Sequence, residues 1–355
     1  MKGLLLAGGF GTRLRPLTYT GNKHMLPIAN KPMLLYGLEH LRSAGIQEVA
    51  VVLGPIGEGV TEVLGDGSRF GLKITYISQP EPRGLAHAVL LSEEYMNRES
   101  FVMYLGDNLL RQGVNDFVQV FDQKRADCVV GVYPVSEPSR YGIAELENGR
   151  VKRLVEKPKN PTSNLALIGV YVFGSSIFSA VKAIKTSWRN ELEITDAIQV
   201  LVSEGRRVEV EHVKGWWKDT GTVGDLLEAN RLVLDDLKTD IQGSVEDNSS
   251  LRGRVATGLH SEIKKGATVM GPSILGSGTT LAQGVYIGPY TSIGNSVVIK
   301  RGEIENSIVM DGCQIDTNER IVDSMIGPDS LITTKTEGGP RGKRLVVGER
   351  STVEL

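Results

Sequence analysis

An aliphatic residue recurs at every sixth position over much of the C-terminal third of this chain. The unbroken part of this series consists of seven positions: Ile263, Val269, Leu275, Leu281, Ile287, Ile293 and Ile299. The same phase includes Val245 and Leu251 upstream, Thr257 interrupts it, and after a one-residue slip it resumes at Ile304, Val309, Ile315 and Ile321. A hexapeptide period is typical of a parallel β-helix, in which three hexapeptides form one triangular coil and the aliphatic side chains stack along its axis.

The composition changes where this repeat begins. Of the 20 aromatic residues, 18 precede position 240, and glycine is denser beyond this position than before it. We expect Gly276, Gly288 and Gly294 to permit the turns of the coils. The sequence therefore predicts three parts: a first domain at 1–239, a β-helix at 240–335 and a tail at 336–355 that caps the last coil.

The first 239 residues alternate between strand-like and helix-like segments. Apolar runs predict strands at 3–7, 49–53, 73–76, 101–105, 128–133 and 170–173, and apolar periodicity predicts helices at 33–44 and 193–203. This alternation indicates an α/β fold with a doubly wound, mainly parallel, Rossmann-like sheet. Ligands of such sheets bind at the carboxyl ends of the strands.

The charge and cysteine content exclude several classes of protein. A net charge of −2 does not favour nucleic acid, and no segment is long and apolar enough to span a membrane. Cys128 and Cys313 are the only cysteines, so we expect no disulfide framework and a cytoplasmic protein. The five histidines have no metal-ligand spacing, and zinc is therefore not expected.

A glycine-rich turn follows the first strand directly. Its glycines, Gly8, Gly9 and Gly11, allow backbone N–H groups to approach an anion, although a plain tight turn remains an alternative. The turn is not a Walker loop, because no Gly-Lys-Ser/Thr follows it, and it lacks the third glycine of a dinucleotide fingerprint. Cationic side chains follow at positions 13, 15 and 23, which favours a phosphate site.

The run from Gly8 to Thr18, followed by Lys23-His24-Met25-Leu26-Pro27, resembles the signature of the sugar-1-phosphate nucleotidylyltransferases. The whole chain most resembles the long-form glucose-1-phosphate thymidylyltransferases, in which a left-handed β-helix follows the catalytic domain. The resemblance implies Mg²⁺-assisted, in-line attack of glucose-1-phosphate on the α-phosphorus of dTTP. The products would be dTDP-glucose and pyrophosphate, for deoxysugar or cell-surface polysaccharide synthesis.

The resemblance also implies roles for individual residues. It makes Arg13, Lys23 and Lys157 catalytic, and Asp107 and Asp219 the Mg²⁺ ligands. The implied nucleotide-binding residues are Leu6, Ala7, Gly8, Gly9, Gly11, Thr12, Arg13, Gln79, Gly84 and Asp107. The implied sugar-phosphate-binding residues are Tyr141, Gly142, Glu156, Lys157, Val170 and Arg189. Simpler alternatives exist: Asp107 in a turn, Asp219 as a helix N-cap, and Glu156-Lys157 as a solvated turn.

Several functional alternatives stay open at this stage. UTP could replace dTTP, and glucosamine-1-phosphate could replace glucose-1-phosphate. Some related β-helix proteins are acetyltransferases, but the repeat region offers only His260 as a candidate base. A non-catalytic regulatory subunit is disfavoured because the implied catalytic and metal residues are all present. A flat-sided β-helix commonly self-associates, so we expect a homo-oligomer, with trimer, dimer and tetramer all open.

Overall fold

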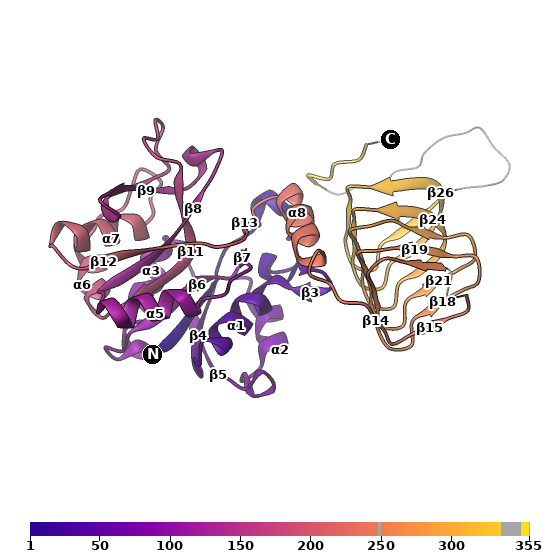
Figure 1. Cartoon of the computed structure of the whole chain (residues 1–355), viewed down its shortest axis with the longest axis horizontal. Helices are drawn as coiled ribbons and strands as arrows, with labels where there is room; N and C mark the ends of the chain where they lie inside the picture. Colours follow the sequence, from indigo (N-terminus) through magenta and orange to yellow (C-terminus); the bar gives the residue numbers. More distant parts are fainter. Residues whose placement is uncertain (248–249, 335–348, 355) are drawn as a thin grey trace. The chain divides into compact units, whose positions relative to one another are not determined.

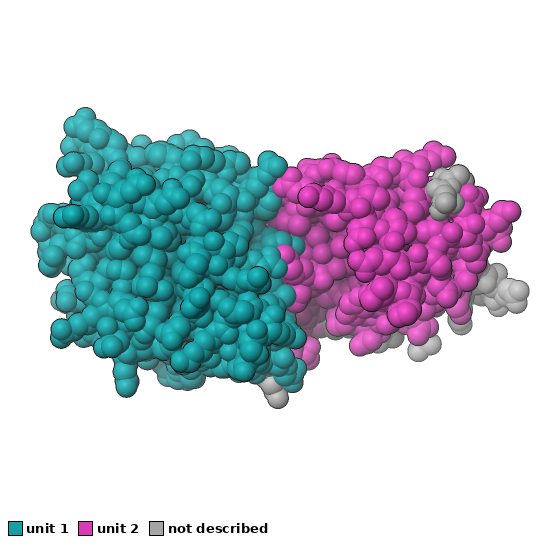
Figure 2. Space-filling model, turned by 60° about the horizontal axis from the view of Figure 1, so that its bottom comes forward, with its two compact units in different colours: residues 1–11, 21–25, 33–219 teal, residues 12–20, 26–32, 220–355 magenta. Residues whose placement is uncertain are grey.

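The computed structural model describes residues 1–247, 250–334 and 349–354. They divide into two compact units, which Figure 2 colours separately. Unit 1 comprises residues 1–11, 21–25 and 33–219, and unit 2 comprises 12–20, 26–32 and 220–355. The domain limits at 239/240 and 335/336 stay predictions, and the capping tail lies for the most part outside the described residues.

Unit 1 is an α/β fold around one nine-stranded sheet. Its strands are β1 (Lys2–Ala7), β4 (Glu48–Leu53), β5 (Lys73–Ser78), β6 (Phe101–Leu105), β8 (Cys128–Pro134), β9 (Gly142–Glu147), β10 (Arg150–Glu156), β11 (Leu165–Phe173) and β12 (Val208–His212). The order β10-β9-β11-β6-β1-β4-β5 forms the main path, and β8 joins β11 to β12. Two short strands, β7 (Asn108–Leu110) and β13 (Trp217–Asp219), form a separate pair.

Helices cover both faces of this sheet, as Figure 1 shows. One face packs α1 (Met33–Ser43), α2 (Glu58–Leu64) and α5 (Asn115–Lys124), and the other packs α3 (Leu85–Leu91), α4 (Glu93–Met96), α6 (Ser176–Ala183) and α7 (Ile194–Ser203). Neighbouring residues of β1 alternate between the two cores, Leu4 and Leu6 in one and Leu5 and Ala7 in the other. This period of two explains the continuous apolar run in the sequence, since both faces of the strand are buried.

The strands and helices predicted in unit 1 are confirmed, and the structure adds strands β9, β10 and β12 and helices α2 to α6. β11 begins at Leu165, five residues before the predicted start at 170, and it pairs antiparallel with β6, β8 and β9. The β9–β10 hairpin is antiparallel as well. The sheet is therefore parallel in β6-β1-β4-β5 and in β8–β12, and antiparallel around β11. No helix among the described residues has both the length and the apolarity needed to cross a bilayer.

The C-terminal part of unit 2 consists of parallel strands wound into stacked coils, consistent with a left-handed β-helix (Figure 1). Its strands are β14 (Asp240–Ile241), β15 (Ser244–Val245), β16 (Leu251–Arg252), β17 (Val255–Thr257), β18 (Glu262–Ile263), β19 (Thr268–Met270), β20 (Ser273–Leu275), β21 (Thr280–Leu281), β22 (Tyr286–Ile287), β23 (Thr291–Ile293), β24 (Val298–Glu305), β25 (Ile308–Val309), β26 (Gln314–Val322), β27 (Met325–Ile326) and β28 (Leu331–Thr333). Leu251 pairs with Val269 and Val255 with Ser273, 18 residues on in each case. One coil is therefore three hexapeptides long.

The slip in the repeat corresponds to a shorter coil. Ile287 pairs with Ile304, 17 residues on, and Ile293 pairs with Val309, 16 residues on. In this coil β24 runs through a position where earlier coils turn, and its pairing with β26 shifts register there. The loss of residues at one corner keeps the aliphatic side chains in phase.

The periodic aliphatic residues form the axial core, as predicted. All seven members of the unbroken series are at most 1% exposed. The predicted role of Gly276, Gly288 and Gly294, however, is incomplete, because none of the three has a φ in the left-handed region. A Cβ at Gly276 would lie 2.5 Å from the carbonyl carbon of Gly294 in the next coil. Close stacking of coils, rather than turn conformation, therefore requires this glycine.

Unit 2 also contains three elements from outside the coils. They are the 3₁₀ turn η1 (Thr12–Leu14), the short hairpin of β2 (Pro27–Ile28) and β3 (Lys31–Pro32), and α8 (Val223–Leu234). The Asn30 side chain donates to the Ile293 carbonyl at 2.6 Å, which fixes the hairpin to a coil. The first domain of the sequence prediction therefore contributes residues to the compact unit of the β-helix.

Candidate active site

The glycine-rich turn begins where β1 ends, and its first part lies in unit 1. The Asn22 side chain donates to the Ala7 carbonyl at 3.0 Å and to the Ile56 carbonyl at 2.7 Å, which closes the turn against a neighbouring loop. A Cβ at Gly9 would lie 2.8 Å from Lys23 Cε, so the lysine side chain crosses directly over this glycine. Sequence reasoning missed Asn22, because nothing in the local pattern distinguishes it from a solvated turn residue.

The structure brings Gln79 and Gly84, the two residues predicted for base recognition, into direct contact. Gln79 follows β5, is 7% exposed and donates through Nε2 to the Gly84 carbonyl at 3.2 Å. Its Nε2 also lies 3.0 Å from His87 Nδ1, and a Cβ at Gly8 would lie 3.2 Å from its Oε1. Gly84 has a φ of +98°, and a Cβ there would lie 2.4 Å from the Leu192 carbonyl oxygen. The packing of the loop therefore already requires glycine at this position.

Asp107 follows β6 by two residues and pairs with Lys23. Both side chains are largely buried, at 16% and 15% exposed. Burial on its own would raise the pKa of the Asp107 carboxyl, but the Lys23 ammonium and the Asn108 amide outweigh it and hold this pKa well below its usual range. Asp107 is therefore a carboxylate at neutral pH.

Asp219 ends β13 and is brought beside Asp107 by strand pairing. β13 pairs antiparallel with β7, and the register sets Asp219 opposite Asn108. The N-cap of α8 is Thr222, whose Oγ1 accepts from the Asp225 amide at 3.2 Å. The alternative reading of Asp219 as an N-cap is therefore wrong.

Asn108 is the buried residue that joins these two strands to the sheet. Its Oδ1 accepts from Trp217 Nε1 at 2.7 Å and from the Gly169 amide at 3.2 Å. Its Nδ2 donates to Asp107 Oδ1 at 3.0 Å and so orients that carboxylate. Sequence reasoning assigned no role to Asn108 or Trp217, since they are 109 positions apart and no motif relates them.

The donor set of Asp107 and Asp219 fits a hard divalent cation. Mg²⁺ is usually held by one or two carboxylates, with phosphate oxygens and water completing its shell. Among the described residues there is no cluster of three or more acidic, His or Cys side chains that could cage a metal without a substrate. One carboxylate in the turn between β6 and β7 and a second at the end of β13 are the arrangement expected for a cation that is shared with a phosphate.

Asp107 and Asp219 line a pocket of unit 1 that also contains most of the residues predicted for the sugar phosphate. Its lining comprises Leu85, Leu105, Asp107, Asn108, Arg140, Tyr141, Gly142, Glu156, Lys157, Leu167, Gly169, Tyr171, Ile194, Thr195, Trp217 and Asp219. Val170 does not line it, because its side chain is buried in the core on the other face of the sheet. Its neighbours Gly169 and Tyr171 do, so any contact of Val170 with a ligand would come from its backbone.

Charged side chains crowd one wall of this pocket. Arg189 is not one of the lining residues; its guanidinium pairs with Glu191 at 2.9 Å, Glu193 at 3.3 Å and Glu156 at 3.4 Å. Lys157 Nζ lies 3.8 Å from Glu156. Burial raises the pKa of Glu156, Glu193 raises it further, and the two cations only partly offset this. Lys157 has a φ of +41°, a strained conformation that is common at functional sites.

Arg13 and Thr12 belong to unit 2, unlike the other predicted site residues. The Arg13 guanidinium lies against Gly221, where a Cβ would come within 2.6 Å of its Nη2. Within the described part of the chain this guanidinium makes no hydrogen bond or ion pair. Arg15, a weaker candidate, stacks on the Tyr19 ring at 4.9 Å, and its buried Nε has no partner among the described residues.

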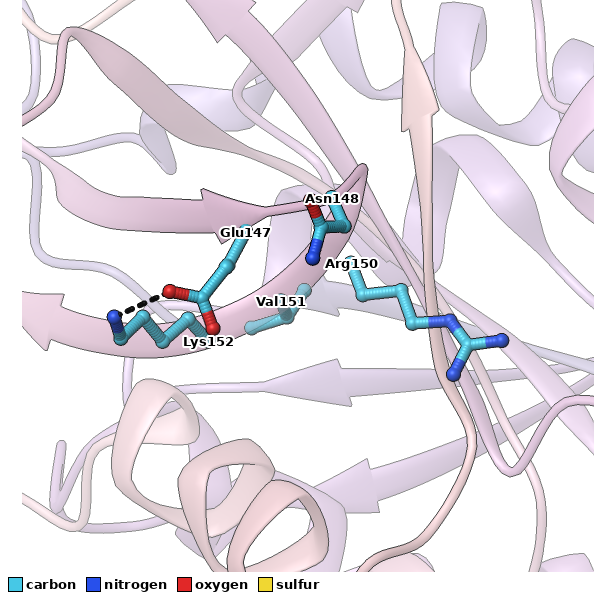
Figure 3. Close-up of a pocket in the computed structure, with 5 residues that line it drawn as sticks. All are labelled: Glu147, Asn148, Arg150, Val151 and Lys152. Carbon is cyan, nitrogen blue, oxygen red and sulfur yellow. Dashed lines mark hydrogen bonds and ion pairs between the residues drawn. The ribbon is translucent and has the colours of Figure 1, made fainter.

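A second depression lies at the turn of the β9–β10 hairpin and carries none of the predicted residues. Its lining is Glu147, Asn148, Arg150, Val151 and Lys152. Figure 3 shows the Lys152–Glu147 ion pair, which has a length of 2.7 Å, with Arg150 directed away from it. Because Lys152 and Glu147 are both exposed and neutralise each other, we interpret this surface as a hairpin turn rather than a site.

Comparison with known proteins gives consistent results. A family model described as nucleotidyl transferase matches residues 2–236. The chain is 46% identical over its whole length to a glucose-1-phosphate thymidylyltransferase of Streptomyces griseus, covering 99% of that protein. It is also 46% identical to a low-salt glycan biosynthesis nucleotidyltransferase of Haloferax volcanii, with all of both chains covered. A solved structure of a putative glucose-1-phosphate thymidylyltransferase from Bacillus anthracis is similar, with a TM-score of 0.63 and 35% identity over 68% of this chain and 97% of that one.

Proposed function

Because this chain belongs to the nucleotidyl transferase family, we propose that it transfers a thymidylyl group from dTTP to glucose-1-phosphate, with release of pyrophosphate. The product is dTDP-glucose. The chain is an enzyme, a sugar-1-phosphate nucleotidylyltransferase, and its substrates are small molecules. The observation that carries the proposal is the pairing of β13 with β7, which brings Asp219 beside Asp107 in the pocket that also contains Glu156 and Lys157.

Mg²⁺ is the proposed cofactor, held by Asp107 and Asp219. When bound, it would neutralise phosphate charge at the reacting centre. Asn108 holds one oxygen of Asp107 by its amide, so the carboxylate is oriented before any ligand arrives. The ammonium of Lys23 is paired with Asp107 and supplies a positive charge at the same point.

The triphosphate is the proposed ligand of the glycine-rich turn. The backbone amides of Gly8, Gly9 and Gly11 approach its oxygens, with Leu6, Ala7 and Thr12 flanking them. Arg13 offers a planar fork of donors for the charge that develops on pyrophosphate, and its guanidinium has no competing partner within the described residues. Gln79 and Gly84 form the base-recognition loop, with Gln79 free to hydrogen-bond a pyrimidine edge through Oε1.

The sugar phosphate is the proposed ligand of the charged wall. Glu156 accepts hydrogen bonds from sugar hydroxyls, while Lys157 and Arg189 attract the phosphate. Tyr141, Gly142 and the backbone of Val170 complete the contact. The Lys157 amide donates to the Tyr141 carbonyl at 3.1 Å, which ties the strained lysine to the neighbouring turn.

The residues of this site bind and orient, and none forms a covalent intermediate. A phosphate oxygen of glucose-1-phosphate attacks the α-phosphorus of dTTP, and the bond from that phosphorus to the bridging oxygen of pyrophosphate breaks. In-line displacement of this kind depends on positioning and charge neutralisation. No proton has to be removed from the nucleophile, because the phosphate is already an anion.

A pyrophosphate-release assay tests the proposal. dTTP, UTP, ATP, GTP and CTP are each combined with glucose-, galactose- and glucosamine-1-phosphate, with and without Mg²⁺. We expect release with dTTP and glucose-1-phosphate only when Mg²⁺ is present. A strong preference for UTP would replace dTTP in the proposal, and no release from any pair would refute it.

The metal ligands are tested by Asp107→Asn and Asp219→Asn. Each should lower turnover by about 10³-fold or more while the protein stays folded, because a neutral amide cannot replace the charge. Asp116→Asn is the matched control, since Asp116 pairs with the exposed Lys214 outside the pocket. Rates near those of the native protein in either metal-site variant would remove that residue from the metal site.

We also propose a cytoplasmic homo-oligomer. Cys128 and Cys313 are both buried free thiols, in keeping with a reducing compartment. Leu259 and Leu331 on the β-helix expose 56% and 69% of their surface, which favours self-association through the coils. Sedimentation of the purified protein tests this, and a monomer at micromolar concentration would contradict it.

A further inference from the structure

The segment that carries Arg13 is part of the compact unit of the β-helix. Residues 12–20 cluster with unit 2, whereas residues 1–11 and 21–25 on either side cluster with unit 1 (Figure 2). Within the segment, Leu14 and Thr18 are each 1% exposed, so it is anchored by buried side chains. What holds it in place inside unit 2 therefore decides where Arg13 lies.

One attachment joins the segment directly to the last described coil. Leu17 Cδ2 lies over Gly327, where a Cβ would come within 3.3 Å of it. Gly327 follows β27, and its carbonyl accepts from Ser330 Oγ at 2.8 Å and from Cys313 Sγ at 3.1 Å. These bonds fix the Gly327 backbone within the coil, so it is a firm surface for the leucine.

A second attachment runs through α8. The Arg13 guanidinium lies against Gly221, two residues before the helix. Within α8, Asn230 is fully buried: its Oδ1 accepts from the Ala29 amide at 2.8 Å and from Ser292 Oγ at 2.7 Å, and its Nδ2 donates to the Tyr290 carbonyl at 3.0 Å. Because leaving such a buried amide unsatisfied is costly, α8 is held in one position against the coils.

The Arg13 side chain, unlike the segment around it, is not held by polar contacts within the described part of the chain. Arg13 is exposed, and its guanidinium makes no hydrogen bond or ion pair among the described residues, so its place depends on the backbone segment that carries it. We propose that the β-helix positions Arg13 for catalysis, through Leu17 on Gly327 and through Gly221 and the α8 residue Asn230. Leu17, Gly327 and Asn230 are positioning residues, and the β-helix takes part in the nucleotidyl transfer step. This inference rests on the role of Arg13 in the proposed function.

The first test adds a side chain at Gly327 in the full-length protein. Gly327→Val pushes Leu17 aside by a few tenths of an ångström or more, and a misplacement of that size should lower kcat by about tenfold. The KM for glucose-1-phosphate should not change, because the proposed sugar site belongs to unit 1. Val322→Ala in β26 is the control, since Val322 is 46% exposed, has no part in either attachment and should leave kcat unchanged.

The decisive test repeats the substitution without the arginine. Arg13→Ala should lower kcat by roughly 10²-fold or more. If Gly327 acts through Arg13, Gly327→Val then causes no further loss in the Arg13→Ala protein. If it acts by general destabilisation, the two losses multiply. Leu17→Ala removes the same attachment, so it should lower kcat on its own and cause no further loss in the Arg13→Ala protein.

Each outcome has a separate meaning. Multiplying losses, or a Gly327→Val protein as active as the native one, would overturn the positioning role while the proposed function stands. An Arg13→Ala protein of native activity would overturn both the role of Arg13 and this inference. If Gly327→Val does not fold, as judged by circular dichroism, Leu17→Ala and Asn230→Ala are put through the same comparison in the Arg13→Ala protein.

Discussion

Protonation of His24 should set the acid stability of unit 1. His24 is 2% exposed, and its Nδ1 lies 2.6 Å from Asn22 Oδ1, which also accepts from the His24 amide at 2.9 Å. Burial, with a further contribution from the Lys23 ammonium, lowers the pKa of His24 from 6.5 to about 3. The folded protein therefore keeps this imidazole neutral at pH values where the unfolded chain protonates it.

The sign and size of the effect follow from this difference. Because the folded pKa is depressed, the stabilisation is fully present above pH 6.5 and is lost as the pH falls towards 3. Each pH unit in this window corresponds to about 1.4 kcal/mol of unfolding free energy, so the loss is about 2 kcal/mol between pH 6.5 and 5. His24→Gln should not show it, because the glutamine amide does not titrate.

Intrinsic fluorescence is the measurement, because all three tryptophans, at positions 188, 216 and 217, lie in unit 1. Urea unfolding is followed from pH 7.5 to 5 for the native protein, His24→Gln and the control His212→Gln, whose ring is exposed. The free energy of the native protein and of His212→Gln should fall about 2 kcal/mol further than that of His24→Gln. Parallel pH curves for all three would show that buried His24 is not the group responsible.

Two further predictions concern the other parts of the molecule. Gly276→Ala brings a Cβ to 2.5 Å from the Gly294 backbone and should lower the free energy of unfolding by about 3 kcal/mol. Gly284→Ala meets no atom within 4 Å, at a φ of +82°, and should lower it by about 1 kcal/mol. Equal shifts of the thermal transition, followed by circular dichroism, would contradict the stacking explanation. Burial and Glu193 raise the pKa of Glu156, so its carboxylate is protonated at a higher pH than usual. The KM for glucose-1-phosphate should therefore rise more in the native enzyme than in Glu156→Gln when the pH is lowered from 7 to 5. Identical pH profiles of KM would show that Glu156 does not bind the sugar.

The β-helix was predictable because its restraint is local and repeated. Each coil needs one aliphatic residue per face, so a single period of six specifies both the strand positions and the axial core. Even the shortened coil was visible, since the residues around Ile299 and Ile304 carry the slip in the sequence itself. The packing of Gly276 was not visible, because its neighbour Gly294 lies a full coil away.

The parts of the site that the sequence did not predict depend on pairing between distant residues. Asp219 meets Asn108 through two strands of three residues each, too short for any periodic pattern. Asn108 bonds Trp217 and Gly169, and all three lie in segments with unrelated local patterns. The family signature suggested the two aspartates, but only the fold explains how they are held together.

The glycine-rich motif is continuous in the sequence, but the fold divides it between the two compact units. From Gly8 to Lys23 it is one stretch, and it predicts one phosphate-binding loop. In the structure its two ends are supported within unit 1, by Asn22 on Ala7 and Lys23 on Asp107, while Arg13 is supported within unit 2 by Leu17 on Gly327 and by Gly221. Substitutions in the last coils should therefore change the step that depends on Arg13, and leave the carboxylates of the pocket in unit 1 as they are.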